Sequence, residues 1–133
     1  MVRKQRSIIV VGDRVLVRPD TESDRTAHGL YLPPGIAEKE RVQSGRVVHV
    51  GPGYPIPNPN FTEDEPWSAR EPARYIPLQA EIGDIAVFLR REATEIELEG
   101  ERMLIVAQPA ILMLVREELH EEPRSREPIN GEG

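Results

Sequence analysis

Short apolar runs rich in β-branched residues, each bounded by turn signals, constrain the fold of this chain most strongly. Because such runs suit half-buried strands, they predict strands at residues 8–18 (broken at Gly12-Asp13), 45–50, 85–89, 94–98, 102–106 and 111–115. Turns between them are predicted at Gly51-Pro52-Gly53, at Ile82-Gly83-Asp84 and, as a two-residue hairpin turn, at Glu99-Gly100. No stretch has a convincing amphipathic helical pattern. We therefore expect an all-β fold, a small β-barrel, in residues 1–116.

The composition narrows the class of protein. The 133 residues suffice for one ordinary domain. A formal net charge of −6 and a pI of about 5.1 argue against nucleic-acid binding, which needs a basic face. Cysteine is absent, which excludes disulfides, a thiolate nucleophile and Cys-ligated zinc, and fits a reducing compartment. The apolar run at residues 8–11 is too short for a membrane span, so we expect a soluble, cytoplasmic protein that binds no membrane.

A long polar segment at residues 20–44 interrupts the pattern of strands. It contains few apolar side chains to offset the entropy of ordering, so we expect a mobile loop. Its apolar triplet, Leu30-Tyr31-Leu32, lies between Gly29 and two prolines. In an extended backbone Leu30 and Leu32 point one way and Tyr31 the other, which would offer two aliphatic side chains to a partner's groove. The residues leave a second interpretation open, in which the triplet is a short edge strand packed on this protein's own core.

Two further segments are unlike the strands. Residues 51–77 hold seven of the thirteen prolines, a density that excludes both a helix and a central strand; they predict an extended Pro-rich loop. Its four aromatic residues suggest that this loop is partly held in place. It has no PxxP cluster with a basic anchor, so a ligand for a proline-reading domain is disfavoured. Residues 117–133 are acidic, and we expect a disordered tail.

The sequence offers little for catalysis. It has no Gly-x-Gly-x-x-Gly motif for a dinucleotide and only three scattered histidines, His28, His49 and His120. Although medium-chain alcohol dehydrogenases contain a barrel of similar shape, they need a nucleotide-binding half and zinc ligands that this chain lacks. We therefore expect no catalytic residues, no metal and no cofactor, and we do not interpret the chain as an enzyme.

Five stretches together resemble the chaperonin-10 family, the GroES-type co-chaperonins, in their order and spacing: residues 11–19, 26–33 with Gly29, 45–53, 82–88 and 94–105. The resemblance implies a GroES-like β-barrel that assembles into a dome-shaped ring, in this family a homoheptamer. Such a ring caps an ATP-driven chaperonin 60-type ring and encloses unfolded client proteins. The Pro-rich loop would then lie at the roof of the dome.

The resemblance also assigns residues to two contacts. It implies that Leu30, Tyr31 and Leu32, preceded by Gly29, dock on the chaperonin, although family members usually carry aliphatic residues at all three positions of the triplet. It further implies that each N-terminal strand pairs with the last strand of the next subunit. The residues at this subunit interface would be Ile8, Ile9 and Val10 on one side and Ile111, Leu112, Met113, Leu114 and Val115 on the other.

Other departures from the family leave an alternative function open. The Pro-rich loop is longer than the roof hairpin typical of bacterial members, residues 90–92 (Arg-Arg-Glu) make that part of the inner wall more charged, and the acidic tail is additional. The alternative is a GroES-like barrel that binds another protein and serves no chaperonin.

Overall fold

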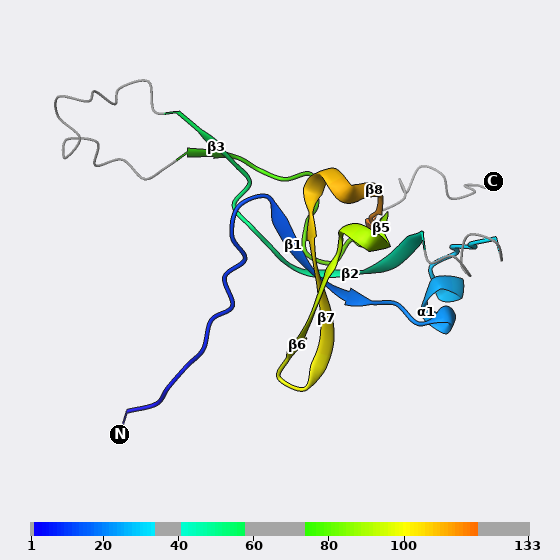
Figure 1. Cartoon of the computed structure of the whole chain (residues 1–133), viewed down its shortest axis with the longest axis horizontal. Helices are drawn as coiled ribbons and strands as arrows, with labels where there is room; N and C mark the ends of the chain where they lie inside the picture. Colours follow the sequence, from blue (N-terminus) through cyan, green and yellow to red (C-terminus); the bar gives the residue numbers. More distant parts are fainter. Residues whose placement is uncertain (1, 34–40, 58–73, 120–133) are drawn as a thin grey trace, which may run out of the picture.

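The computed structural model describes residues 2–33, 41–57 and 74–119. Six strands form one antiparallel sheet in the order β6-β7-β1-β2-β5-β8 (Figure 1). Their bounds are β1 Arg14–Pro19, β2 Val42–Val50, β5 Ile85–Leu89, β6 Thr94–Leu98, β7 Glu101–Ala107 and β8 Ile111–Val115. The short strands β3 (Tyr54–Ile56) and β4 (Arg74–Ile76) form a second, two-stranded sheet. The remaining elements are one short helix, α1 (Glu22–Ala27), and two 3₁₀ turns, η2 (Arg90–Glu92) and η3 (Gln108–Ala110). The all-β prediction is confirmed.

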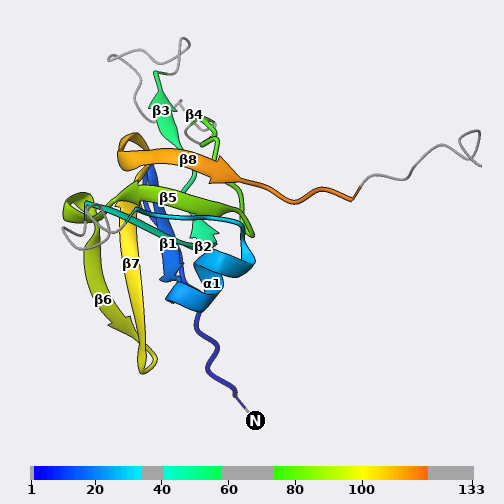
Figure 2. The same cartoon turned by 90° about the vertical axis from the view of Figure 1, so that its right-hand side faces the viewer.

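The six-stranded sheet bends strongly around a single apolar core. In Figure 2, β5 and β8 cross the top of the molecule while β6 and β7 run down its side. The fully buried side chains come from four strands and interlock inside this bend: Val15, Val17, Val47, Phe88 and Val106. Side chains from β8 pack on the edge of the cluster. Burial of these apolar groups is the main force that holds the sheet in its curved shape.

The strand bounds agree with the sequence where the pattern is local and differ where pairing is long-range. Three strands have the predicted bounds, and the turn at Glu99 and Gly100 has the two positive φ angles, 53° and 81°, of a tight hairpin. The strand predicted at residues 8–18 has its expected break, since Gly12 has φ 67° and β1 begins after it at Arg14, but the part before the break was wrong, because residues 8–11 form no strand. The strand predicted at residues 45–50 begins earlier, at Val42, because that polar stretch pairs with β5.

The small sheet β3-β4 projects from the body as an arm (Figure 1). Its base is held by backbone bonds from Gly51 N to Arg14 O (2.8 Å) and from Gly53 N to Gly12 O (3.0 Å). Gly53 is required there, since its φ is 115° and a Cβ would overlap the carbonyl oxygen of Ile76. The loop predicted at residues 51–77 did not include the paired strands β3 and β4, which form within it; residues 58–73 lie outside the described part.

Candidate functional site

The polar segment predicted to be a mobile loop contains the helix α1, and its start is fully capped. The Thr21 hydroxyl accepts a hydrogen bond from the Asp24 amide (3.1 Å), and the Asp24 carboxylate accepts one from the Thr21 amide (2.9 Å). This reciprocal capping box satisfies donors that a helix start otherwise leaves open. The hydrogen bonds from Thr21 also hold the pKa of Asp24 below its usual value.

The C-terminal end of α1 is also capped by backbone hydrogen bonds. The Gly29 amide donates to Thr26 O (3.0 Å), and the Leu30 amide donates to Arg25 O (2.8 Å), which is the bond pattern of a Schellman motif. Gly29 has φ 80°, while the space around its missing Cβ is empty, so the backbone conformation is what favours glycine here. The expectation that residues 20–44 lack secondary structure was wrong at α1 and from Val42 onwards; residues 34–40 lie outside the described part.

Asp20 ties the two ends of this segment together. Its amide donates to Ser44 O (2.9 Å), and its carboxylate accepts a bond from the Ser44 hydroxyl (2.9 Å). The other carboxylate oxygen lies 3.5 Å from His28 Nε2, just beyond the end of α1. Ser44 is 1% exposed and the Asp20 side chain 5%. These contacts therefore hold the two ends of the segment at residues 20–44 against the paired strands β1 and β2.

The triplet follows directly after the Schellman motif. Leu30 and Leu32 are half-buried, whereas Tyr31 is 78% exposed, so alternate residues do face opposite ways. In the single chain the most exposed side chain of the triplet is Tyr31, while Leu30 and Leu32 are partly exposed; their docking on a partner stays a prediction. The edge-strand interpretation was wrong: no strand is formed at residues 30–33, and neither leucine belongs to the core cluster.

The predicted interface residues near the two ends of the chain lie apart and are substantially exposed. Residues 2–11 form no secondary structure, and Ile9 and Val11 are 79% and 67% exposed. At the other site β8 is the last strand of the sheet, with Leu112 and Met113 about half exposed. In Figure 1 the N-terminal segment descends on the left of the body while β8 lies on its right, so the structure does not bring these two surfaces together within one chain.

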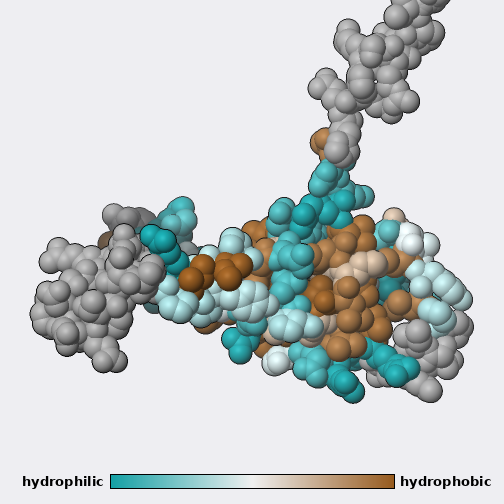
Figure 3. Space-filling model, turned by 90° about the horizontal axis from the view of Figure 1, so that it is seen from above, coloured by the Kyte–Doolittle hydropathy of each residue, from teal (hydrophilic) through white to brown (hydrophobic). Residues whose placement is uncertain are grey.

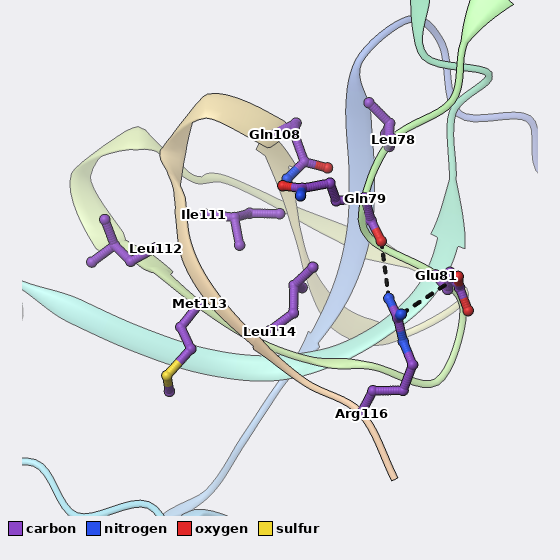
Figure 4. A pocket seen from close by; sticks show the side chains of 9 residues that line it. All are labelled: Leu78, Gln79, Glu81, Gln108, Ile111, Leu112, Met113, Leu114 and Arg116. Atoms are coloured by element: carbon purple, nitrogen blue, oxygen red, sulfur yellow. Dashed lines mark hydrogen bonds and ion pairs between the residues drawn. The ribbon is translucent and has the colours of Figure 1, made fainter. Parts of the chain in front are cut away.

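A hollow of about 570 Å³ lies beside β8 (Figure 4). Leu78, Ile111 and Leu114 give it an apolar wall, and Arg116 closes one end. Seen from above in Figure 3, hydrophobic surface gathers beside the hydrophilic stretch that leads up into the grey C-terminal residues. An exposed strand edge next to apolar surface is a template for pairing with another strand.

Arg116 fixes the end of β8 to the main body. Its Nε and Nη2 donate to the two carboxylate oxygens of Asp84 (2.8 and 2.7 Å), and Nη2 also donates to Gln79 O (2.9 Å). Asp84 is 2% exposed, and its bonds to Arg116 hold the pKa of this carboxyl below its usual value despite burial. Sequence reasoning missed this pair, because no local pattern links residues so far apart in the chain.

Comparison with known proteins gives a consistent result. Residues 7–64 match the family described as "Chaperonin 10 Kd subunit". A protein named Co-chaperonin GroES from Coprothermobacter proteolyticus is 34% identical over 108 residues, which cover 81% of this chain and 94% of that protein. Proteins of the same name from Thermus thermophilus (32% over 106 residues; 80% and 89% covered) and Geotalea daltonii (33% over 103 residues; 77% and 91%) are similar.

Proposed function

This chain belongs to the chaperonin-10 family, and on that basis we propose that it is a co-chaperonin that caps an ATP-driven chaperonin 60-type ring and assists protein folding. The observation that carries the proposal is the 34% identity to a protein named Co-chaperonin GroES over 94% of that protein's length. The relatives' printed names describe chaperone partners and no catalysis, so the function is one of binding.

The surface proposed to meet the chaperonin is the triplet Leu30-Tyr31-Leu32. It is supported by its place at the end of a short helix on the segment that Asp20 anchors, and by the exposure of Tyr31. Because the leucines are half-buried, docking requires them to turn outward, which makes each single contact weak. Several copies on one ring raise the overall affinity without new contacts, so weak contacts still allow tight yet reversible capping.

The ring itself is part of the proposal. The segment Ile8–Val10 of one subunit would pair with the free edge of β8 in the next, and its apolar side chains would cover the hollow beside Leu78. Since the two surfaces lie at opposite ends of the chain, the contact is head-to-tail and repeats until a ring closes. We infer a heptamer that encloses unfolded clients in the cytoplasm, with the β3-β4 arm at its roof. Among the described residues no helix is long and apolar enough to cross a bilayer.

The capping function is tested by mixing the protein with a chaperonin 60-type ring and ATP and measuring co-elution on gel filtration. Leu30→Asp and Leu32→Asp should each abolish co-elution while the small ring stays intact, because a charge cannot enter an apolar groove without a large desolvation cost. Ile76→Asp is the matched control, since Ile76 is an exposed aliphatic residue (54%) on β4, far from the triplet in the sequence, and it should cap normally.

Two results would contradict the proposal. If both leucine variants still co-elute, the triplet is not the docking surface. If the unmodified protein is a monomer and changes neither the ATPase rate nor client release, the chain is a GroES-like module with another binding partner.

A further inference from the structure

We propose that the seam between subunits carries complementary charges, with basic residues before the N-terminal segment of one subunit facing acidic residues after β8 of the next copy of this chain. This inference rests on the ring proposed above. It adds that these charges set the relative orientation of the N-terminal segment and β8 at the subunit contact, and that they make the stability of the ring depend on salt concentration.

The basic side of the seam is Arg3, Lys4 and Arg6. All three are exposed and precede the apolar residues Ile8 and Ile9 in a segment without secondary structure. In the described ranges, no ion pair involves any of the three. Three positive charges close together in a chain of net charge −6 repel one another and gain from an acidic surface.

The acidic side is Glu117 and Glu118, which follow β8 directly and are exposed. The preceding Arg116 is bound to the buried carboxylate of Asp84, so its charge is largely compensated there. The strand end that would meet the next subunit is therefore acidic, and Figure 3 shows this hydrophilic stretch leaving the body beside the hydrophobic surface.

The charge pattern selects an antiparallel arrangement of the two strands. If the N-terminal segment runs antiparallel to β8 with Ile8 opposite Val115, the apolar residues of the two strands lie opposite one another. Arg6 then lies opposite Glu117. Arg3 is then in diagonal reach of Glu118, and Lys4 is in diagonal reach of Glu117. Aligned parallel, with Ile8 opposite Leu112, the basic residues would face the uncharged turn η3, and Asp13 would come opposite Glu117. The parallel arrangement therefore loses the attraction and adds a repulsion.

These charges should contribute little free energy to the contact between two subunits and much more to the stability of the whole ring. Exposed ion pairs are individually weak and are screened by salt over a Debye length of about 8–10 Å under ordinary conditions. A closed ring repeats the seam at every subunit, so a small change per seam shifts the concentration at which the ring dissociates. Reversing two charges replaces attraction by repulsion, and we expect at least about a tenfold rise in that concentration at low salt.

The first experiment measures ring dissociation of the full-length protein by sedimentation velocity over a range of concentrations. Lys4→Glu with Arg6→Glu should weaken the ring, as should Glu117→Lys with Glu118→Lys, and the variant with all four changes should recover most of the loss. Both effects should shrink at about 0.5 M salt, where the Debye length is only a few Å. The controls are Arg91→Glu, at a side chain 84% exposed, and Glu97→Lys, on exposed β6, which should behave like the unmodified protein.

The second experiment uses the absence of native cysteine to determine the strand orientation. Ile8→Cys combined with Val115→Cys should form a disulfide between subunits on mild oxidation, because directly opposed residues lie within the distance that a disulfide spans. Ile8→Cys with Leu112→Cys, the pair that a parallel arrangement would oppose, should remain reduced.

The outcomes separate this inference from the function on which it rests. If the ring forms and caps but the reversed-charge variants match the controls, or if only the Leu112 pair crosslinks, the charged seam is wrong and the co-chaperonin function stands. If the unmodified protein forms no ring at any concentration, both the seam and the proposed ring are wrong.

Discussion

Asp84 is a carboxylate enclosed by protein, and its two oxygens are fully used by Arg116 and by the Glu81 amide (2.8 Å). Asp84→Ala would remove these acceptors and leave the Glu81 amide and the Arg116 Nε without the partner they have in the folded protein. We expect the free energy of unfolding at pH 7 to fall by about 2 kcal/mol, the usual cost of stranding buried polar groups. Urea unfolding at a fixed protein concentration measures this loss. Glu81→Gln is the control, since that carboxylate is 66% exposed and 3.6 Å from the same arginine, and it should change little.

The same residue gives a dependence on pH. Because the folded pKa of Asp84 lies below its usual value of 3.8, its contribution to stability is complete above that pH and is lost as the pH falls through the lowered pKa. The difference in unfolding free energy between the unmodified protein and Asp84→Ala should therefore shrink as the pH falls below about 4. A difference that stays constant over this range would show that the ion pair is not what stabilises the end of β8.

At the scale of the element, α1 has only six residues, all of them exposed or half-buried, so its stability depends on its caps. Thr21→Ala removes the capping box and should cost about 1 kcal/mol of helix stability. Amide exchange at Gly29 and Leu30, which report the Schellman bonds, should then be about five times faster. Ser23→Ala, an exposed helical position, is the control and should not accelerate exchange. Equal exchange in both variants would mean that the capping box does not hold the helix.

The elements also show how far sequence reasoning reaches. Strands β5, β6 and β8 were predictable because each is an apolar or alternating run between turn signals. Helix α1 was missed because its signal lies in its caps, Thr21 with Asp24 and then Gly29, and not in an apolar face. The early start of β2 was missed because Gln43 and Ser44 look like loop residues and become strand only through pairing with β5. The triplet was predicted as a binding site from its isolation among polar residues, and this stays a prediction; the partial burial of Leu30 and Leu32 depends on tertiary contacts that no local pattern encodes.

At the scale of the whole molecule, the N-terminal segment contributes neither a core side chain nor a strand to its own subunit. Ile9 is 79% exposed in the single chain, so nothing in that chain explains a need for an apolar residue there. In the proposed ring the same side chain is buried against the next subunit. Ile9→Asp should therefore leave the subunit folded and prevent the ring from forming, because a desolvated carboxylate at the seam has no partner.

Ile76→Asp provides the matched comparison, as an exposed isoleucine (54%) on β4 replaced by the same acid away from the proposed seam residues. Sedimentation velocity should show a ring for the Ile76 variant and a single folded subunit for the Ile9 variant, with circular dichroism that matches the unmodified protein in both. A ring that survives Ile9→Asp would place the subunit contact elsewhere. Loss of the β-sheet signal would instead mean that the N-terminal segment stabilises its own subunit. In the proposed ring, the residues that stabilise a subunit are therefore separate from those that hold the assembly together, and we expect a single surface substitution to remove the second property without the first.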